Sequence, residues 1–160
     1  MRELLPLAER AGALLKQRGE TVAVAESSSG GLISAALLGV AGASAWYLGG
    51  GVIYTPKARA VLMDIPRSAV AGMRSASEPY ALLLACTARE RMAATWGVSE
   101  AGAAGPTGNP YGDAAGHTCI AISGPVDAAI TLETGSPDRI ANMHAFAAAA
   151  LELLLRGIQA

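Results

Sequence analysis

The segment from Thr21 to Leu38 limits the folds open to this chain more than any other. Its first part, Thr21–Glu26 (TVAVAE), is short and alternating, which predicts a β-strand. The strand runs directly into the small polar turn Ser27–Gly31 (SSSGG), and the apolar run Leu32–Leu38 predicts a helix. A strand joined by a tight turn to a helix is a building unit of α/β domains.

The rest of the chain predicts further helices and strands, with a hairpin near the end. Helices are expected at about residues 2–18, at Lys57–Met63, from the capping residue Ser77 to near Gly97, and from about Ile140 to Ile158. Strands are expected at Val52–Tyr54, Ser99–Ala104, His117–Ser123 and Ala128–Thr134, the last two paired as a hairpin. No repeat or linker divides the chain. The sequence therefore predicts one domain over residues 1–160, a three-layer α/β fold with a mixed β-sheet flanked by helices.

Composition argues against several kinds of partner. The formal net charge is −1 and Lys and Arg do not cluster, so no nucleic-acid surface is expected. Charged residues interrupt the N-terminal apolar stretch, which argues against a signal peptide or membrane span and favours a cytoplasmic protein. Cys86 and Cys119 are isolated, so no disulfide is expected. Charged residues make up only 16% of the chain, which favours a homo-oligomer, expected to be a dimer.

Three Gly- and Ser-rich loops, at residues 26–31, 41–51 and 102–112, are predicted to follow strand ends, where α/β proteins bind ligands. Residues Ser27–Gly31 offer hydroxyl and backbone N–H groups at a helix N-terminus, which suits an anion such as phosphate. The alternative is that Ser29 caps the helix and the glycines permit a sharp turn. The loop lacks the lysine and the glycine spacing of nucleotide-binding motifs, so nucleoside triphosphate chemistry is not expected.

Ser44, Tyr54 and Lys57 form a second candidate set. A serine becomes a nucleophile when a base such as lysine or tyrosine lies beside it in a dry pocket. The alternative is a capping role for Ser44, a core-edge position for Tyr54 and a solvated Lys57. His117 and Cys119 fit one face of a strand, but no other residues complete a metal-ligand spacing. No metal site is therefore expected.

Four segments in this order carry a resemblance to a known family. They are Ala25–Gly31 (AESSSGG), Gly42–Ser44 (GAS), Gly50–Tyr54 (GGVIY) and Gly102–Pro106 (GAAGP). The chain resembles, over nearly its whole length, the C-terminal domain of the competence/damage-inducible protein CinA, in a standalone form. That family includes nicotinamide-nucleotide amidohydrolases. The resemblance implies hydrolysis of nicotinamide mononucleotide, a pyridine mononucleotide, to nicotinate mononucleotide and ammonia, with no cofactor.

The resemblance also implies roles for individual residues. Ser44 falls on the proposed nucleophilic serine of the family and Tyr54 on its site tyrosine. Lys57 is then the expected base, because Arg59 stands where the family usually has a lysine and arginine is a poor proton acceptor. The residues expected to contact the substrate are Glu26, Ser27, Ser28, Ser29, Gly30, Gly31, Arg59, Gly102, Gly105 and Arg139.

The chain departs from the family pattern in ways that leave two functions open. Ser28 and Ser29 replace a Cys-Thr pair, and Ala101 replaces a threonine. These changes and Arg59 favour a binding or regulatory module that keeps the pocket without turnover. Ser44, Tyr54 and Lys57 favour an amidohydrolase, and acyl transfer on another amide stays open as a third reading.

Overall fold

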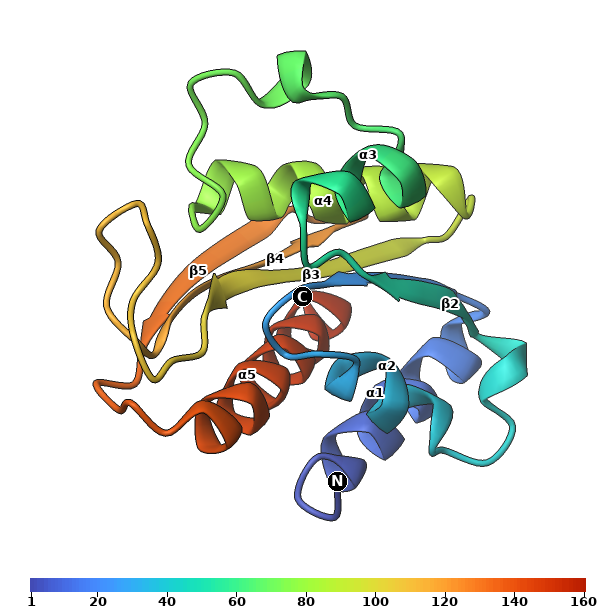
Figure 1. The fold of residues 1–160 in the computed structure, drawn as a ribbon. Coiled ribbons are helices and arrows are strands. Elements are labelled where there is room, and N and C mark those ends of the chain that lie inside the picture. The colour runs from blue at the N-terminus through green and yellow to red at the C-terminus, as the bar shows by residue number, and fades with distance from the viewer.

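The computed structural model describes all 160 residues. They form a five-stranded sheet between two layers of helices (Figure 1). The strand order is β2-β1-β3-β4-β5. Strand β1 (Val22–Glu26) pairs in parallel with β2 (Tyr47–Val52) and β3 (Trp96–Ala103). Strands β4 (His117–Ser123) and β5 (Ala128–Glu133) continue the sheet in antiparallel pairs. The predicted three-layer α/β fold with a mixed sheet and a late hairpin is thus confirmed.

Three helices cover one face of the sheet: α1 (Leu5–Arg18), α2 (Leu32–Leu38) and α5 (Arg139–Gln159). Between them and the sheet lies the main hydrophobic core, a cluster of 22 buried residues that includes Trp46, Trp96 and Leu154. Helix α5 is capped by Asp138, whose carboxylate accepts the Ala141 N–H at 3.0 Å. No helix combines the length and the apolar character needed to cross a lipid bilayer.

The opposite face is covered by α3 (Pro56–Met63) and α4 (Glu78–Arg91), joined by a long segment that contains the short 3₁₀ helix η2 (Arg67–Val70). The predicted Ser77 cap is confirmed, because its hydroxyl accepts the Tyr80 N–H. The predicted extension of this helix to near Gly97 is wrong, because Gly97 belongs to β3. A Cβ at Gly97 would lie 1.9 Å from the Ala85 carbonyl oxygen, so its absence lets α4 pack closely on the sheet.

The second strand lies earlier in the chain than predicted. Gly49, Gly50 and Gly51 do not lead into the strand but form part of it, paired with residues 23–25 of β1. A Cβ at Gly50 would lie 2.8 Å from the Val24 carbonyl oxygen, which explains why a residue type depleted in strands is used here. Residues 41–46, with the 3₁₀ helix η1 (Ala43–Ala45), therefore precede β2 and do not follow a strand end.

Candidate active site at the strand ends

A polar cleft lies where the C-terminal ends of β1 and β3 meet the loop that follows β3. It consists of two adjoining hollows of about 300 Å³ and 270 Å³. The side chains and backbone that line it include Ser27, Ser28, Tyr54, Arg59, Gly102, Gly105, Asn109 and Arg139. Because parallel strands end at the same edge of a sheet, residues far apart in sequence meet here. We call this region the strand-end cleft.

The turn after β1 is fixed by the carboxylate of Glu100, which is fully buried on β3. Its Oε2 accepts the backbone N–H groups of Ser27 at 3.1 Å and Ser29 at 2.8 Å. Its Oε1 accepts the hydroxyls of Ser28 and, at 2.9 Å, of Thr118. Four donors replace water around this charge, which explains how a carboxylate is tolerated in the interior.

A second buried carboxylate, Glu26, occupies the N-terminus of α2. It accepts the backbone N–H groups of Gly31, Ile33 and Ser34 at 2.9–3.0 Å, and the hydroxyls of Ser29 and Ser34 at 2.8 and 2.6 Å. These are the groups that would bind an external anion at a helix N-terminus. The predicted phosphate site on the Ser27–Gly31 turn is therefore already filled by the carboxylates of the chain itself.

Arg139, at the start of α5, closes one end of the cleft. One guanidinium nitrogen donates to the Gly105 carbonyl oxygen at 2.6 Å and the other to the Tyr54 hydroxyl at 3.2 Å. This places a positive charge directly on the Tyr54 oxygen. The arrangement suits a tyrosine that carries partial negative charge during proton transfer.

Two groups of the turn remain without a partner inside the protein. The Ser27 hydroxyl makes no hydrogen bond within the chain, although Ser27 is only partly exposed and lines the cleft. The Ser28 backbone N–H, between two N–H groups that bind Glu100, also makes none. A free hydroxyl followed by a free N–H is the pairing that an acyl-transfer site needs, as nucleophile and oxyanion donor.

The predicted contact residues divide into two groups. Ser27, Ser28, Tyr54, Arg59, Gly102, Gly105 and Arg139 line the cleft. Glu26, Ser29, Gly30 and Gly31 do not line it. Glu26 and Ser29 are fully buried and hold the turn in place, so their contribution is structural support rather than contact with a ligand in the cleft.

Ser44 and Lys57 lie apart from the cleft. Ser44 precedes β2, beside the start of β1, because Val22 pairs with Tyr47 in the parallel register. Tyr54 follows the opposite end of β2, and the six residues of that strand separate the two ends by about 20 Å. The predicted Ser44–Tyr54 pair is therefore not formed. Lys57 is exposed on α3 and lines a neighbouring hollow instead.

Sequence reasoning missed Glu100 and the residues that shape the loop after β3. Glu100 is the only charged residue of a fully or largely buried strand, and that mismatch is the signal for a functional or structural polar contact. Asp113 accepts from Arg74 at 2.9 Å and from the Asn109 side chain at 2.8 Å, which fixes the loop over the cleft. The Arg74–Asp113 contact joins segments that lie 39 positions apart in the sequence.

His117 lies behind that loop at the start of β4. Its Nδ1 pairs with the Glu133 carboxylate and its Nε2 lies 2.9 Å from the Ala76 carbonyl oxygen. Burial alone would lower the pKa of His117, but these two hydrogen bonds and the nearby Asp113 carboxylate raise it above its usual value. Burial raises the pKa of the neighbouring Cys119 thiol. Nowhere do three or more His, Cys, Asp or Glu side chains come together to hold a metal ion.

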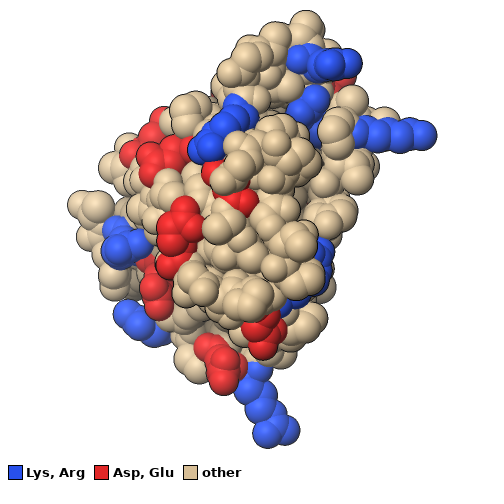
Figure 2. Space-filling model, turned by 60° about the vertical axis from the view of Figure 1, so that its left-hand side comes forward, with Lys and Arg blue, Asp and Glu red and all other residues tan.

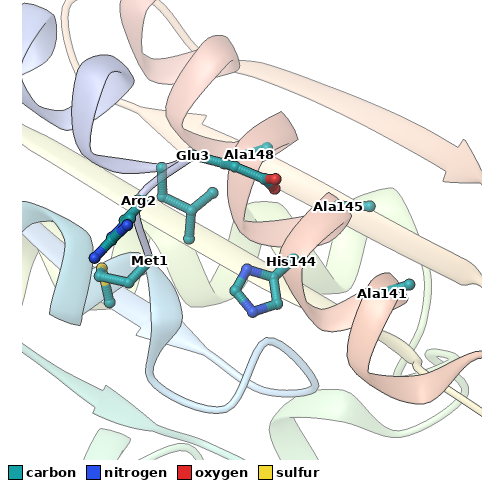
Figure 3. Close-up of a pocket in the computed structure, with 8 residues that line it drawn as sticks. Met1, Arg2, Glu3, Ala141, His144, Ala145 and Ala148 are labelled. Atoms are coloured by element: carbon teal, nitrogen blue, oxygen red, sulfur yellow. The ribbon is translucent and has the colours of Figure 1, made fainter.

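A separate hollow of about 660 Å³ lies between the N-terminal residues and α5 (Figure 3). Met1, Arg2 and Glu3 face Ala141, His144, Ala145 and Ala148 across it. The Nδ1 atom of His144 is buried there without a hydrogen-bond partner. None of the predicted site residues lines this hollow, and most of its helical wall is alanine.

The fold and the cleft define an α/β protein with a polar cleft at the carboxyl ends of its parallel strands. The family model of the CinA C-terminal domain matches residues 4–158. The chain belongs to the CinA C-terminal domain family.

Individual relatives agree with this assignment. The chain is 39% identical over 112 residues to a CinA-like protein of Prochlorococcus marinus, covering 70% of this chain and 26% of that protein. It is 40% identical over 138 residues to a CinA-like protein of Anaeromyxobacter sp., covering 85% of this chain and 34% of that protein. The chain thus spans about a quarter to a third of the length of these relatives.

Solved structures share the fold. A competence/damage inducible protein, CihA, from Agrobacterium tumefaciens superposes with a TM-score of 0.89 at 28% identity, over 98% of this chain and 96% of that one. A CinA superfamily protein from Klebsiella pneumoniae superposes with a TM-score of 0.91 at 23% identity, over 98% of both chains.

Proposed function

We propose that this chain is an amidohydrolase that converts nicotinamide mononucleotide to nicotinate mononucleotide and ammonia in the strand-end cleft. The proposal rests on the family resemblance for the substrate and on one observation for the chemistry. That observation is the unpaired Ser27 hydroxyl in the same hollow as Tyr54, whose own hydroxyl accepts a hydrogen bond from Arg139. We assign the nucleophile to Ser27 in place of the predicted Ser44.

In this mechanism the Ser27 oxygen attacks the carboxamide carbon, and its proton passes to the phenolate form of Tyr54, whose negative charge Arg139 stabilises. The Ser28 N–H binds the developing oxyanion. The C–N bond breaks as the nitrogen takes that proton back from the Tyr54 hydroxyl and leaves as ammonia. Water then hydrolyses the acyl-serine ester, which releases the carboxylate product and restores the serine.

Arg59 supports the second candidate, a binding module without turnover. It stands at the position of the family lysine and cannot accept a proton at physiological pH. Lys57, the predicted substitute, lies outside the cleft. If Tyr54 cannot serve as the base, the cleft binds the nucleotide and does not hydrolyse it.

The test is ammonia release from nicotinamide mononucleotide by the native chain and by the Ser27→Ala and Ser44→Ala variants. We expect the native chain and Ser44→Ala to release ammonia at similar rates and Ser27→Ala to lose at least a thousandfold, the scale typical of a lost serine nucleophile. Loss in Ser44→Ala with retention in Ser27→Ala would overturn the assignment. Binding without ammonia release in all three proteins would support the binding module instead.

The expected assembly of the chain into a dimer stays a prediction.

A further inference from the structure

One cation of this chain is placed unlike the others. Of the twelve Lys and Arg residues, Arg59 alone is buried, with 5% of its surface exposed. No carboxylate lies within 4 Å of it, and the only hydrogen bond of its side chain runs from Nε to the Ile65 carbonyl oxygen at 3.4 Å. A buried guanidinium without a counter-ion is costly unless a ligand supplies the negative charge.

The two terminal nitrogens of Arg59 are not sealed inside the protein. The side chain forms the wall between the strand-end cleft and a second hollow of about 790 Å³, which also contains Pro56, Ser75 and Tyr111 of the cleft wall. Lys57 and Arg67 line this second hollow, and no Asp or Glu does. We call it the basic hollow. Figure 2 shows basic side chains gathered at the upper end of the molecule, where α3 and the segment after it lie.

The helix N-terminus that would otherwise take a phosphate is filled by Glu26, and Glu100 accepts the N–H groups of Ser27 and Ser29. Only the Ser28 N–H of the Ser27–Gly31 turn is left free, and the proposed mechanism assigns it to the oxyanion, so no backbone site on this turn remains for a phosphate. Arg59 lines the same hollow as Ser27, and no carboxylate lies within 4 Å of its guanidinium.

We propose that the basic hollow formed by Arg59, Lys57 and Arg67 is an anion site for the phosphate monoester of the ligand whose amide reaches Ser27. The identity of the amide rests on the proposed function, but the anion site itself does not. Arg59 supplies a fixed, planar pair of donors to two phosphate oxygens, and Lys57 and Arg67 add positive charge from the rim. The replacement of the family lysine by arginine thus turns this position from a proton acceptor into a phosphate contact.

The experiment is calorimetric titration of the folded chain with inorganic phosphate, with ribose 5-phosphate and with ribose. We expect both phosphates to bind and ribose not to bind. Arg59→Gln should weaken phosphate binding at least tenfold, the effect of losing a charged hydrogen bond. The surface variant Lys57→Gln/Arg67→Gln, which leaves the buried position intact, should weaken it severalfold. Arg10 is an exposed arginine on α1, so Arg10→Gln is the matched control and should bind phosphate like the native chain.

The anion site would be overturned if phosphate failed to bind the native chain, or if it bound Arg59→Gln as tightly as the native chain. The Ser27→Ala variant separates this proposal from the enzymatic one, because it should lose ammonia release and keep phosphate binding. Arg59-dependent phosphate binding in a native chain that releases no ammonia would leave the anion site standing and reject the amidohydrolase. Ammonia release by the native chain, together with phosphate binding that does not depend on Arg59, would reject the anion site and leave the amidohydrolase standing.

Discussion

The Glu26 carboxylate receives the backbone N–H of Ser34 at 2.9 Å and the Ser34 hydroxyl at 2.6 Å. A side chain from the end of β1 thus provides the N-terminal anion of α2, a position that an external phosphate takes in many α/β proteins. The chain's own carboxylates therefore shape this turn, and the helix end is not open to an external anion.

Replacement of Glu26 by glutamine should destabilise the fold. The amide cannot match a carboxylate that accepts five hydrogen bonds, and its NH₂ group faces N–H donors. We expect a loss of about 1–3 kcal/mol in the free energy of unfolding, measured by urea denaturation. Glu9→Gln, on the exposed face of α1, is the control and should change little. Equal stability of Glu26→Gln and the native chain would show that the carboxylate does not hold the helix.

Glu100→Gln should affect both stability and catalysis. The variant weakens the contacts to the Ser27 and Ser29 N–H groups, so the turn that carries the Ser27 hydroxyl becomes less well fixed. We expect a fall of tenfold or more in kcat for ammonia release at temperatures where circular dichroism shows a folded protein. Thr118→Val removes one neutral donor to the same carboxylate and should have a much smaller effect on kcat. An unchanged kcat in Glu100→Gln would contradict this positioning role.

Arg139→Gln should reduce turnover while leaving the fold stable. Its guanidinium holds the Tyr54 hydroxyl and the Gly105 carbonyl from the partly exposed start of α5. Loss of that charge should lower kcat, because the negative charge on the Tyr54 oxygen during proton transfer is then less stabilised. Arg156→Gln, exposed near the end of the same helix, is the comparison and should leave kcat unchanged. A kcat for Arg139→Gln equal to that of the native chain would remove the Tyr54–Arg139 contact from the proton transfer.

Stability should fall as pH rises above about 6.5, the usual pKa of histidine, in the range where folded His117 loses its proton. The raised pKa means that the folded state holds this proton more tightly than the unfolded chain. The stabilisation is therefore complete below the unfolded pKa and is lost as pH passes through the folded one. Melting temperatures of the native chain and of His117→Gln across this range give the comparison. The native decrease should be absent or smaller in the variant, and parallel curves would contradict the assignment.

The sequence predicted the fold well where local patterns decide it. The alternating β1, the apolar Leu32–Leu38 helix and the Ser77 cap depend on residues close together in the chain, and all three are confirmed. The second strand was misplaced because Gly49–Gly51 has no strand propensity of its own. The pairing of β2 with β1 and the close approach of the β1 backbone decide the structure of this segment. Neither can be seen in a local sequence pattern.

The site was predicted in part for the same reason. Ser27, Tyr54 and Arg139 were found through motifs, and the structure brings all three to the strand-end cleft. The position of Ser44 relative to Tyr54 depends on the direction in which β2 runs between them, which spacing alone does not give. Glu100 acts through contacts with a turn more than seventy positions away, so only the folded chain reveals what it does.

The most direct test of this account is a crystal structure of Ser27→Ala with bound nicotinamide mononucleotide. We predict that the carboxamide lies beside position 27 and Tyr54, and that the phosphate lies on Arg59 in the basic hollow. A nucleotide bound beside Ser44, or in the hollow between the N-terminal residues and α5, would contradict the central claim that the strand-end cleft is the site.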